Sequence, residues 1–338
     1  MKRAQQLAAA TVVMTLILIA VGVYVRASGS GLGCPDWPTC HGGVIPPAQK
    51  HSLIEVSHRI VASLVGFMVI GNAILAWKHY RHVPFIVWLA ALTVPLVGFQ
   101  GILGAITVVR ELPAEVVATH LLTAMLVLSA EIVLTVAMYR EDPARRDRFV
   151  RPATQVARTG RWALLALVWL SAVLWVGGYM SESGAAAACD AWPGCTGASL
   201  IPAADEHEIT HMLHRYLAGA FILLLIPVMR AARALSPSPS PPSAEGRGEG
   251  GRTPSPSPAA AGGGSQARLG RALPMLWAAQ VTVGAFNVWF TFPDLLTVSH
   301  TVIASLIWGT LTGMAALAFY VPQPAAIPRP VRASGETP

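Results

Sequence analysis

The sequence predicts an all-α integral membrane protein in which eight transmembrane helices form two pseudo-repeated four-helix bundles. Three observations support this class. First, 54% of the 338 residues are hydrophobic and only 12% are charged, whereas soluble domains carry about 25% charged residues. Second, several apolar runs are long enough to cross the roughly 30 Å hydrocarbon layer of a bilayer. Third, motifs of the first half return in the second half, which indicates an internal repeat.

Eight apolar segments are expected to cross the membrane. In chain order they lie near 8–26, 53–77, 83–108, 116–138, 162–181, 208–230, 273–292 and 296–320. The first follows Lys2 and Arg3, as a secretory signal would, but the apolar part of a signal runs only about 7–15 residues. We therefore expect this helix to be retained. An even number of spans places both termini on one side of the membrane.

Basic residues concentrate in alternate loops. Lys2 and Arg3 precede the first span, and arginines crowd the segments 140–161 and 230–271. The positive-inside rule places these segments in the cytoplasm. We therefore expect a multi-pass protein of a bacterial-type inner (cytoplasmic) membrane, with both termini cytoplasmic and the cysteine loops extracytoplasmic. The net charge of +7 reflects this topology, so no nucleic-acid partner is expected.

The internal repeat is visible in two pairs of motifs. CPDWPTC at 34–40 returns as CDAWPGC at 189–195, and QGILGAITV at 100–108 returns as QVTVGAFNV at 280–288. Each half begins on the same side of the membrane, so the repeat is parallel. Cofactor sites in helical bundles are built from side chains on facing helices, and the repeat therefore predicts two such sites.

The repeat also sets the expected domains. The first bundle is expected over 1–150, and the second over 151–235 and 269–322. Residues 236–268 are almost all Ser, Pro, Gly and Ala, which bury too little apolar surface to offset chain ordering. We expect this segment to be a disordered cytoplasmic linker, and 323–338 to be a cytoplasmic tail.

Four histidines occupy equivalent places near the outer ends of their spans: His58 and His120 in the first half, and His214 and His300 in the second. A single histidine in a membrane span often makes only an interhelical hydrogen bond. Four in a repeated pattern instead favour metal ligation, with each pair holding one heme iron. A zinc site would need about four clustered ligands, and the spans contain no such cluster.

Three arginines lie close to these histidines. Arg59 and Arg215 directly follow His58 and His214, and Arg26 closes the first span. Arginine pairs well with carboxylates, so each could bind a heme propionate. The alternative is that they are interface anchors whose charged heads reach the membrane surface.

One acidic residue distinguishes the two halves. Glu55 lies three residues before His58, so both side chains project from one face of the helix, whereas His211 takes that place before His214. Glu55 could act as a general base or stabilise a developing carbocation; the alternative is a helix-start residue at the surface. Glu131 has no assigned role and is expected to be a hydrogen-bonded structural carboxyl.

The four cysteines lie in the two loops that are expected to be extracytoplasmic. Because that environment is oxidising, disulfides Cys34–Cys40 and Cys189–Cys195 are expected. Their spacing differs from the CxxC of redox enzymes and the CxxCH of covalent heme attachment. A structural and a redox role both stay open, and the first pair is the stronger redox candidate because it lies above Glu55.

The motifs GSGLGCPDWPTCHG, EVSHR, QGILGAITV, CDAWPGC and HMLHR, together with the helices that carry His120 and His300, resemble those of the heme A synthase family. The resemblance runs through both halves, from about Arg26 to about Phe319. The segment 236–268 departs from the family pattern, but it lies far from the candidate sites.

The resemblance implies a function for each half. Members of the family oxidise the C8 methyl of heme O to a formyl group by successive hydroxylations, for use in cytochrome oxidase. It implies that His58 and His120 hold the substrate heme O, and that His214 and His300 hold a permanent heme b. Glu55 matches the catalytic glutamate of the family, and Cys34 and Cys40 match its functionally important cysteine pair.

The resemblance also implies partners in the bilayer. These are heme O synthase, cytochrome oxidase assembly factors and an electron acceptor that the sequence does not identify. Two other classes of protein use the same pattern of histidines. A diheme b-type membrane electron carrier would have no need of Glu55, and a heme-binding transporter or chaperone would release its heme unmodified. A disulfide-generating enzyme would leave the histidines without a purpose.

Overall fold

The protein is built from helices that run nearly the full thickness of the molecule. The computed structural model describes residues 1–142, 154–203, 205–235 and 258–320, and this part of the chain contains helices and no strand. The helices are α1 (Lys2–Ala27), α2 (Lys50–Tyr80), α3 (Pro84–Val109), α4 (Ala114–Arg140), α6 (Thr154–Glu182), α7 (Glu206–Ala220), α8 (Ile222–Arg233), α9 (Pro258–Trp289) and α10 (Asp294–Phe319), with short 3-10 turns at Ala185–Ala187 and Thr196–Ala198.

The expected spans correspond to these helices. Within the described residues, seven helices are long and apolar enough to cross a membrane, when α7 and α8 count as one helix over Glu206–Arg233. The eighth expected span, 273–292, lies mostly in α9, whose apolar stretch is interrupted by the polar residues Gln280 and Asn287. The prediction of an all-α, multi-pass membrane protein is confirmed.

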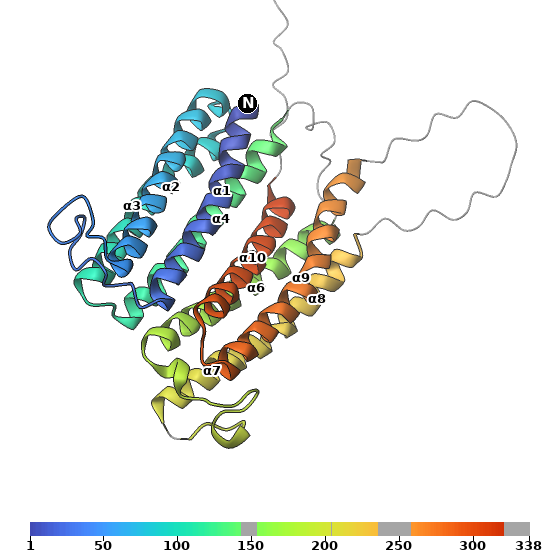
Figure 1. Ribbon diagram of the computed structural model, residues 1–338. Helices are drawn as coiled ribbons and strands as arrows, with labels where there is room; N and C mark the ends of the chain where they lie inside the picture. The colour runs from blue at the N-terminus through green and yellow to red at the C-terminus, as the bar shows by residue number, and fades with distance from the viewer. Residues whose placement is uncertain (143–153, 204, 236–257, 321–338) are drawn as a thin grey trace, which may run out of the picture.

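The two halves form adjacent bundles (Figure 1). Helices α1 to α4 make the first bundle, and α6, the pair α7–α8, α9 and α10 make the second, with α1, α4, α6 and α10 in contact along the boundary. Both connections from the third to the fourth helix of a half contain two residues with positive φ, Glu111 and Leu112 in one half and Thr291 and Phe292 in the other. The internal repeat is therefore visible in the backbone as well as in the sequence.

A continuous core joins the two bundles. Ile19 of α1 and Leu128 of α4 belong to the same buried cluster as Leu170 of α6 and Leu311 of α10. Hydrogen bonds also cross the boundary, because the Trp308 indole donates to the Ser129 hydroxyl at 2.7 Å and the Trp175 indole donates to the Thr119 hydroxyl at 3.2 Å. In a bilayer such packing and hydrogen bonding hold helices together, since lipid is as apolar as their side chains.

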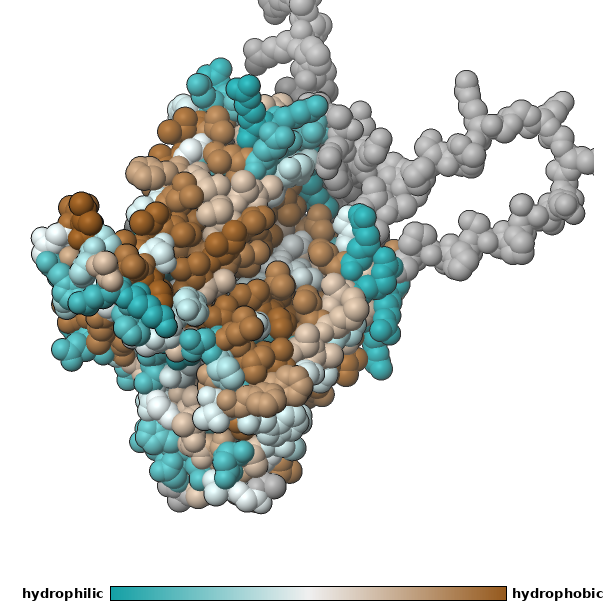
Figure 2. All heavy atoms as spheres, in the orientation of Figure 1, coloured by the Kyte–Doolittle hydropathy of each residue, from teal (hydrophilic) through white to brown (hydrophobic). Residues whose placement is uncertain are grey.

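The surface shows the band expected of a membrane protein. Apolar side chains cover the middle of the visible face, and hydrophilic side chains gather towards its two ends (Figure 2). The loops that follow α1 and α6, which carry the cysteines, lie at the end of the molecule away from the N-terminus (Figure 1). Both cysteine loops therefore share one side, as the repeat predicts.

The expected linker boundary needs a correction. Residues 258–268 were expected to belong to the linker, but they form the first part of α9. Gln266 and Ala267 are buried there, and the Gln266 side chain donates to the Met314 carbonyl oxygen at 2.8 Å. This packing, together with the alanines of the segment, supports a helix that composition alone did not predict. The remainder, 236–257, and the expected tail, 323–338, lie outside the described residues.

Candidate functional site

Each histidine of the first half lies against a glycine of a neighbouring helix. The His58 ring on α2 packs against Gly22 of α1, where an added Cβ would come within 2.9 Å of the ring atom Cε1. The His120 ring on α4 packs against Gly104 of α3, where the corresponding distance is 3.3 Å. A larger side chain at Gly22 would displace the ring, so this glycine lets the two helices approach closely and fixes where the imidazole lies.

The second half repeats this arrangement. His214 on α7 packs against Gly177 of α6, and an added Cβ would lie 2.8 Å from Cε1 of the ring. His300 on α10 packs against Gly284 of α9 at 3.0 Å. The four histidines predicted from the repeat therefore occupy four equivalent settings, each on a different helix from the glycine that supports it.

The two rings of the second half face each other at a distance that suits a shared metal ion. The ring centroids of His214 and His300 are 6.5 Å apart, which leaves room for one metal bonded to a nitrogen of each ring at about 2 Å. Nδ1 of His214 donates to the Val173 carbonyl oxygen at 3.2 Å. Because a carbonyl oxygen only accepts, this contact leaves Nε2 as the ring nitrogen with a free lone pair.

In the other three rings the unpartnered nitrogen is Nδ1, and Nε2 of His300 lies 3.0 Å from Nε2 of Gln280. Nδ1 of His58, His120 and His300 is buried without a hydrogen-bond partner among the described residues, and buried polar groups rarely stay unsatisfied. Within the described ranges, no three His, Cys, Asp or Glu side chains converge as a zinc site would require. Two imidazoles per site suit a heme, because the porphyrin supplies the remaining ligands itself.

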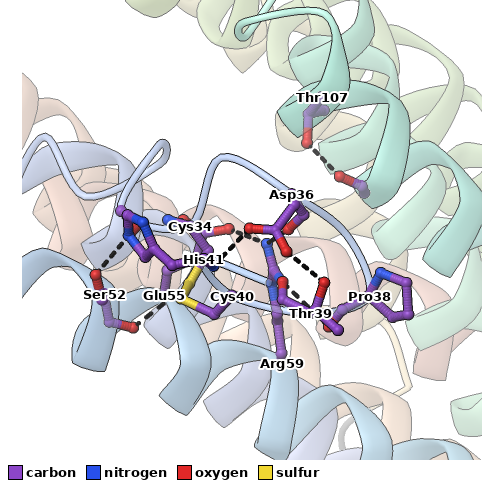
Figure 3. Close-up of polar contacts among 12 residues, drawn as sticks. Cys34, Asp36, Pro38, Thr39, Cys40, His41, Ser52, Glu55, Arg59 and Thr107 are labelled. Carbon is purple, nitrogen blue, oxygen red and sulfur yellow. Dashed lines mark hydrogen bonds and ion pairs between the residues drawn. A yellow bond between two sulfur atoms is a disulfide. The ribbon is translucent and has the colours of Figure 1, made fainter. Parts of the chain in front are cut away.

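Glu55 links the first histidine helix to the first cysteine loop (Figure 3). Glu55 is only 4% exposed, so it is not the surface residue that was the alternative interpretation. One carboxylate oxygen accepts from the Cys34 backbone N–H at 2.8 Å, and the other accepts from the Arg59 guanidinium at 2.5 Å. Arg59 also donates to the carbonyl oxygens of Thr39 and Asp36 at 2.7 and 3.1 Å.

In the second half, a neutral histidine stands in the place of this carboxylate. Nδ1 of His211 donates to the Ala185 carbonyl oxygen at 3.1 Å, and its Nε2 accepts from Arg215 at 2.9 Å. Arg215 also donates to the carbonyl oxygens of Ala191 and Gly194 in the second cysteine loop. The loop-holding arginine is thus kept in both halves, whereas its partner on the helix changes from an acid to an imidazole.

Both predicted disulfides are present, Cys34–Cys40 and Cys189–Cys195. The first loop has an additional turn, in which the Thr39 hydroxyl and the backbone N–H groups of Gly42 and His41 donate to the Asp36 carboxylate. These hydrogen bonds, with that from Thr39 the strongest, hold the pKa of Asp36 below its ordinary value. Figure 3 shows this loop lying over Glu55 and Arg59.

The other polar residues singled out in the sequence lie elsewhere. Arg26 forms an ion pair with Glu182 at 3.1 Å and also donates to the Ser181 carbonyl oxygen, so it joins the two halves at the end of α1. Glu131 is buried and accepts from the Thr15 hydroxyl at 2.7 Å. A role for Arg26, Arg59 or Arg215 towards heme propionates stays a prediction.

The sequence did not predict the contacts that support the candidate site residues. Gly22 and Gly177 were not singled out, although they occupy equivalent positions in the repeat and a comparison of the two first spans would have found them. The binding of loop carbonyls by Arg59 and Arg215 depends on how each loop folds back over its helix. That information is not present in the spacing of the residues.

Known proteins resemble this chain over most of its length. The model of a family described as cytochrome oxidase assembly protein matches residues 5–244. A heme A synthase of Alkalihalophilus pseudofirmus is 34% identical over 232 residues, which cover 68% of this chain and 76% of that protein. The chain belongs to the heme A synthase family.

Other heme A synthases support this assignment. That of Symbiobacterium thermophilum is 31% identical over 243 residues, covering 70% of this chain and 78% of the relative, and that of Shouchella clausii is 30% identical, covering 69% and 80%. The family resemblance predicted from the motifs is confirmed. Membership of an enzyme family of heme A biosynthesis implies heme-related chemistry; that the paired histidines serve it stays a prediction.

Proposed function

We propose that this protein oxidises the C8 methyl of heme O to the formyl group of heme A by successive hydroxylations. The observation that carries the proposal is that the two halves hold equivalent pairs of histidines, but only the first half places a buried carboxylate one helical turn from its histidine. The first bundle would then act on a heme through its carboxylate, and the second bundle would only bind one.

The first half is the proposed substrate site. His58 and His120 would bind the iron of heme O from opposite faces, which orients the macrocycle and therefore the methyl group that reacts. Glu55 would accept protons as the methyl carbon is oxidised and would stabilise positive charge that develops on it. Its contacts with Arg59 and the Cys34 N–H fix the carboxylate in place, so little reorganisation is needed during the reaction.

The second half is the proposed site of a permanent heme b, held by His214 and His300. When bound, heme b would supply one-electron redox chemistry and pass electrons to an acceptor outside the protein. The Val173 carbonyl oxygen orients the His214 ring through Nδ1, which strengthens Nε2 as a ligand. His211 carries no negative charge, and its Nε2 already accepts from Arg215, so no carboxylate stands beside the second histidine pair to stabilise positive charge on a reacting carbon.

The proposal includes an orientation in the membrane. The termini would lie in the cytoplasm and both disulfide loops outside it, because basic residues crowd the segments that would be cytoplasmic. Cys34–Cys40 would then lie on the oxidising side, directly above Glu55. Heme O synthase and assembly factors of cytochrome oxidase are the proposed partners, since they would deliver the substrate and receive the product.

The test is to express the protein in a host that makes heme O but no heme A, and to identify the extracted hemes by mass. Wild type should yield heme A. Glu55→Gln keeps the side-chain length and can still accept from the Cys34 N–H, but it cannot take a proton, so heme A should fall by at least about 100-fold while heme O or a hydroxylated intermediate accumulates.

Two controls make this test specific. Absorbance of the purified variant should show that heme b is retained, and the Cys34–Cys40 bond should remain resistant to thiol labelling. A diheme electron carrier would give no new heme with wild type and no change with Glu55→Gln. A heme transporter would likewise release heme O unmodified, so finding only heme O in the wild-type extract would contradict the proposal.

A further inference from the structure

The first half has an apolar groove on the outer side of α3. It has a volume of about 260 Å³ and an entirely apolar lining surface, and it is formed by Trp37, Ile102, Ala105, Ile106, Val109 and Arg110. Trp37 comes from the first disulfide loop, and the other residues come from the outer end of α3 and the residue that follows it. The groove therefore lies between a loop that covers the site of the first half and the lateral surface of the bundle.

The equivalent place in the second half carries a cluster of aromatic rings, of which Phe286, Trp289 and Phe290 are 37%, 53% and 62% exposed. The repeat puts Phe286, Trp289 and Phe290 at the positions of Ile106, Val109 and Arg110. The Phe286 ring lies 5.8 Å from the rings of both Trp289 and Phe290. Trp289 also meets Trp192, the counterpart of Trp37, at 6.1 Å in an edge contact. We call Trp192, Phe286, Trp289 and Phe290 the aromatic plug.

The groove and the support of the His120 ring share one stretch of α3. Ala105, which lines the groove, directly follows Gly104, which supports the His120 ring. One turn earlier on α3, a Cβ added to Gly101 would meet nothing within 4 Å, and the repeat replaces this glycine with Val281 in the second half. The two helices thus keep the same small residues next to the histidine, Gly104 and Ala105 in α3 and Gly284 and Ala285 in α9, and differ one turn earlier, where Val281 replaces Gly101.

We propose that this groove receives the isoprenoid tail of heme O, and that the aromatic plug keeps a tail-bearing heme out of the second site. This inference rests on the proposed function, because it assumes that the first site takes heme O. The tail is a long hydrocarbon chain, and an apolar groove on the stretch of α3 that supports the His120 ring offers it contact without burying any polar group. Heme b has no such chain and needs no groove.

The plug therefore explains how two sites with the same ligands select different hemes. A hydrophobic site discriminates by the volume it leaves available, and bulky rings at the groove position remove that volume. Each buried CH₂ group contributes about 0.8 kcal/mol. Since about 1.4 kcal/mol changes affinity tenfold, contact with a few carbons of the tail is enough to set the preference.

The experiment transfers the plug to the first half. Ile106→Phe combined with Val109→Trp should weaken heme O binding to the purified protein, with heme b in place, by at least about tenfold, and should leave the binding of tail-free iron protoporphyrin unchanged. Leu92→Trp on α3 is the control, because Leu92 is exposed on the same helix and away from the groove; it should alter neither affinity.

Three results would overturn the inference. The first is that the double variant binds heme O as tightly as wild type does. The second is that heme O and iron protoporphyrin are weakened equally. The third is that wild type binds both hemes with equal affinity, in which case the groove would hold a lipid acyl chain. The reciprocal variant, Phe286→Ile with Trp289→Val, tests the plug separately. This variant should admit heme O to the second site, so the fraction of heme O among the hemes extracted from the purified protein should rise. An unchanged fraction would count against the plug.

The proposal that the groove binds the tail and the proposal that the protein oxidises heme O can fail independently. If the double variant loses heme O selectively but wild type never forms heme A, the groove is supported and the proposed oxidation fails. If wild type forms heme A and the double variant binds heme O normally, the oxidation stands and the groove is rejected.

Discussion

The two bundles share their scaffold and differ at a few positions around it. Glycines support all four histidine rings, and an arginine holds each disulfide loop. In contrast, Glu55 is matched by His211, the groove beside Trp37 is matched by the aromatic plug, and the Asp36 turn is matched by Ala191. The comparison shows that the supported histidine pair is present twice, whereas the buried carboxylate one turn before the histidine of the second helix is present only in the first half.

The largest expected effect separates the two histidine pairs. His300→Ala should remove most of the b-type absorbance of the purified protein, because one of the two proposed ligands of heme b would be lost. His58→Ala should keep that absorbance and abolish heme A formation. Absorbance spectra and heme extraction measure both quantities. If both variants lost the same heme, the division of labour between the halves would be wrong.

The next effect concerns the pair Glu55 and His211. Glu55→Gln is expected to lower heme A formation by at least about 100-fold. His211→Gln should lower it far less, since an amide can still accept from Arg215 and His211 lies in the half that is proposed to hold heme b without acting on the substrate. Comparable losses in product for the two variants, at equal heme b content, would show that the carboxylate is not what distinguishes the halves.

A smaller effect is expected at the supporting glycines. Gly22→Ala would place a Cβ 2.9 Å from the His58 ring, and Gly177→Ala would place one 2.8 Å from the His214 ring. Overpacking of this kind costs about 1–3 kcal/mol. Binding of heme O should weaken in the first variant and retention of heme b in the second. Gly98→Ala is the control, because an added Cβ there meets nothing within 4 Å, and an effect as large as that of Gly22→Ala would contradict the prediction.

The smallest effect is expected in the first disulfide loop. Asp36→Ala copies Ala191 of the second loop and should speed amide hydrogen exchange at His41 and Gly42, whose N–H groups lose their acceptor. Because the folded pKa of Asp36 is lowered, its contacts are fully present above the unfolded pKa of about 3.9 and are lost as pH falls through the lower folded value. At the same pH, the exchange rates of wild type and Asp36→Ala should therefore become equal only in strong acid. Equal rates at neutral pH would mean that the turn does not order the loop.

The sequence predicted the elements that depend on period and repetition. Apolar runs located the helices, and the repeat located His58, His120, His214 and His300 without any three-dimensional information. Pairwise comparison of the halves also identified Glu55 as the residue without a counterpart. These features are local or periodic, so a single sequence contains them.

What the sequence did not predict depends on tertiary contact. Arg26 follows the first span as an anchor would, but its partner is Glu182 in the other half. Gln266, which composition places in a linker, lies in α9 and is buried against α10, where it donates to the Met314 carbonyl oxygen. The groove beside Trp37 is visible only when the loop is seen against α3. In each case the deciding partner is far away in the chain.

The boundary between the bundles has a further consequence for how the protein can be handled. Indole and hydroxyl groups, an ion pair and a shared apolar core join the halves directly. Two separately translated polypeptides, cut within the peptide connection between α4 and α6, should recognise each other in the bilayer. Isotope labels could then be confined to one half, which would let spectroscopy observe one heme pocket at a time.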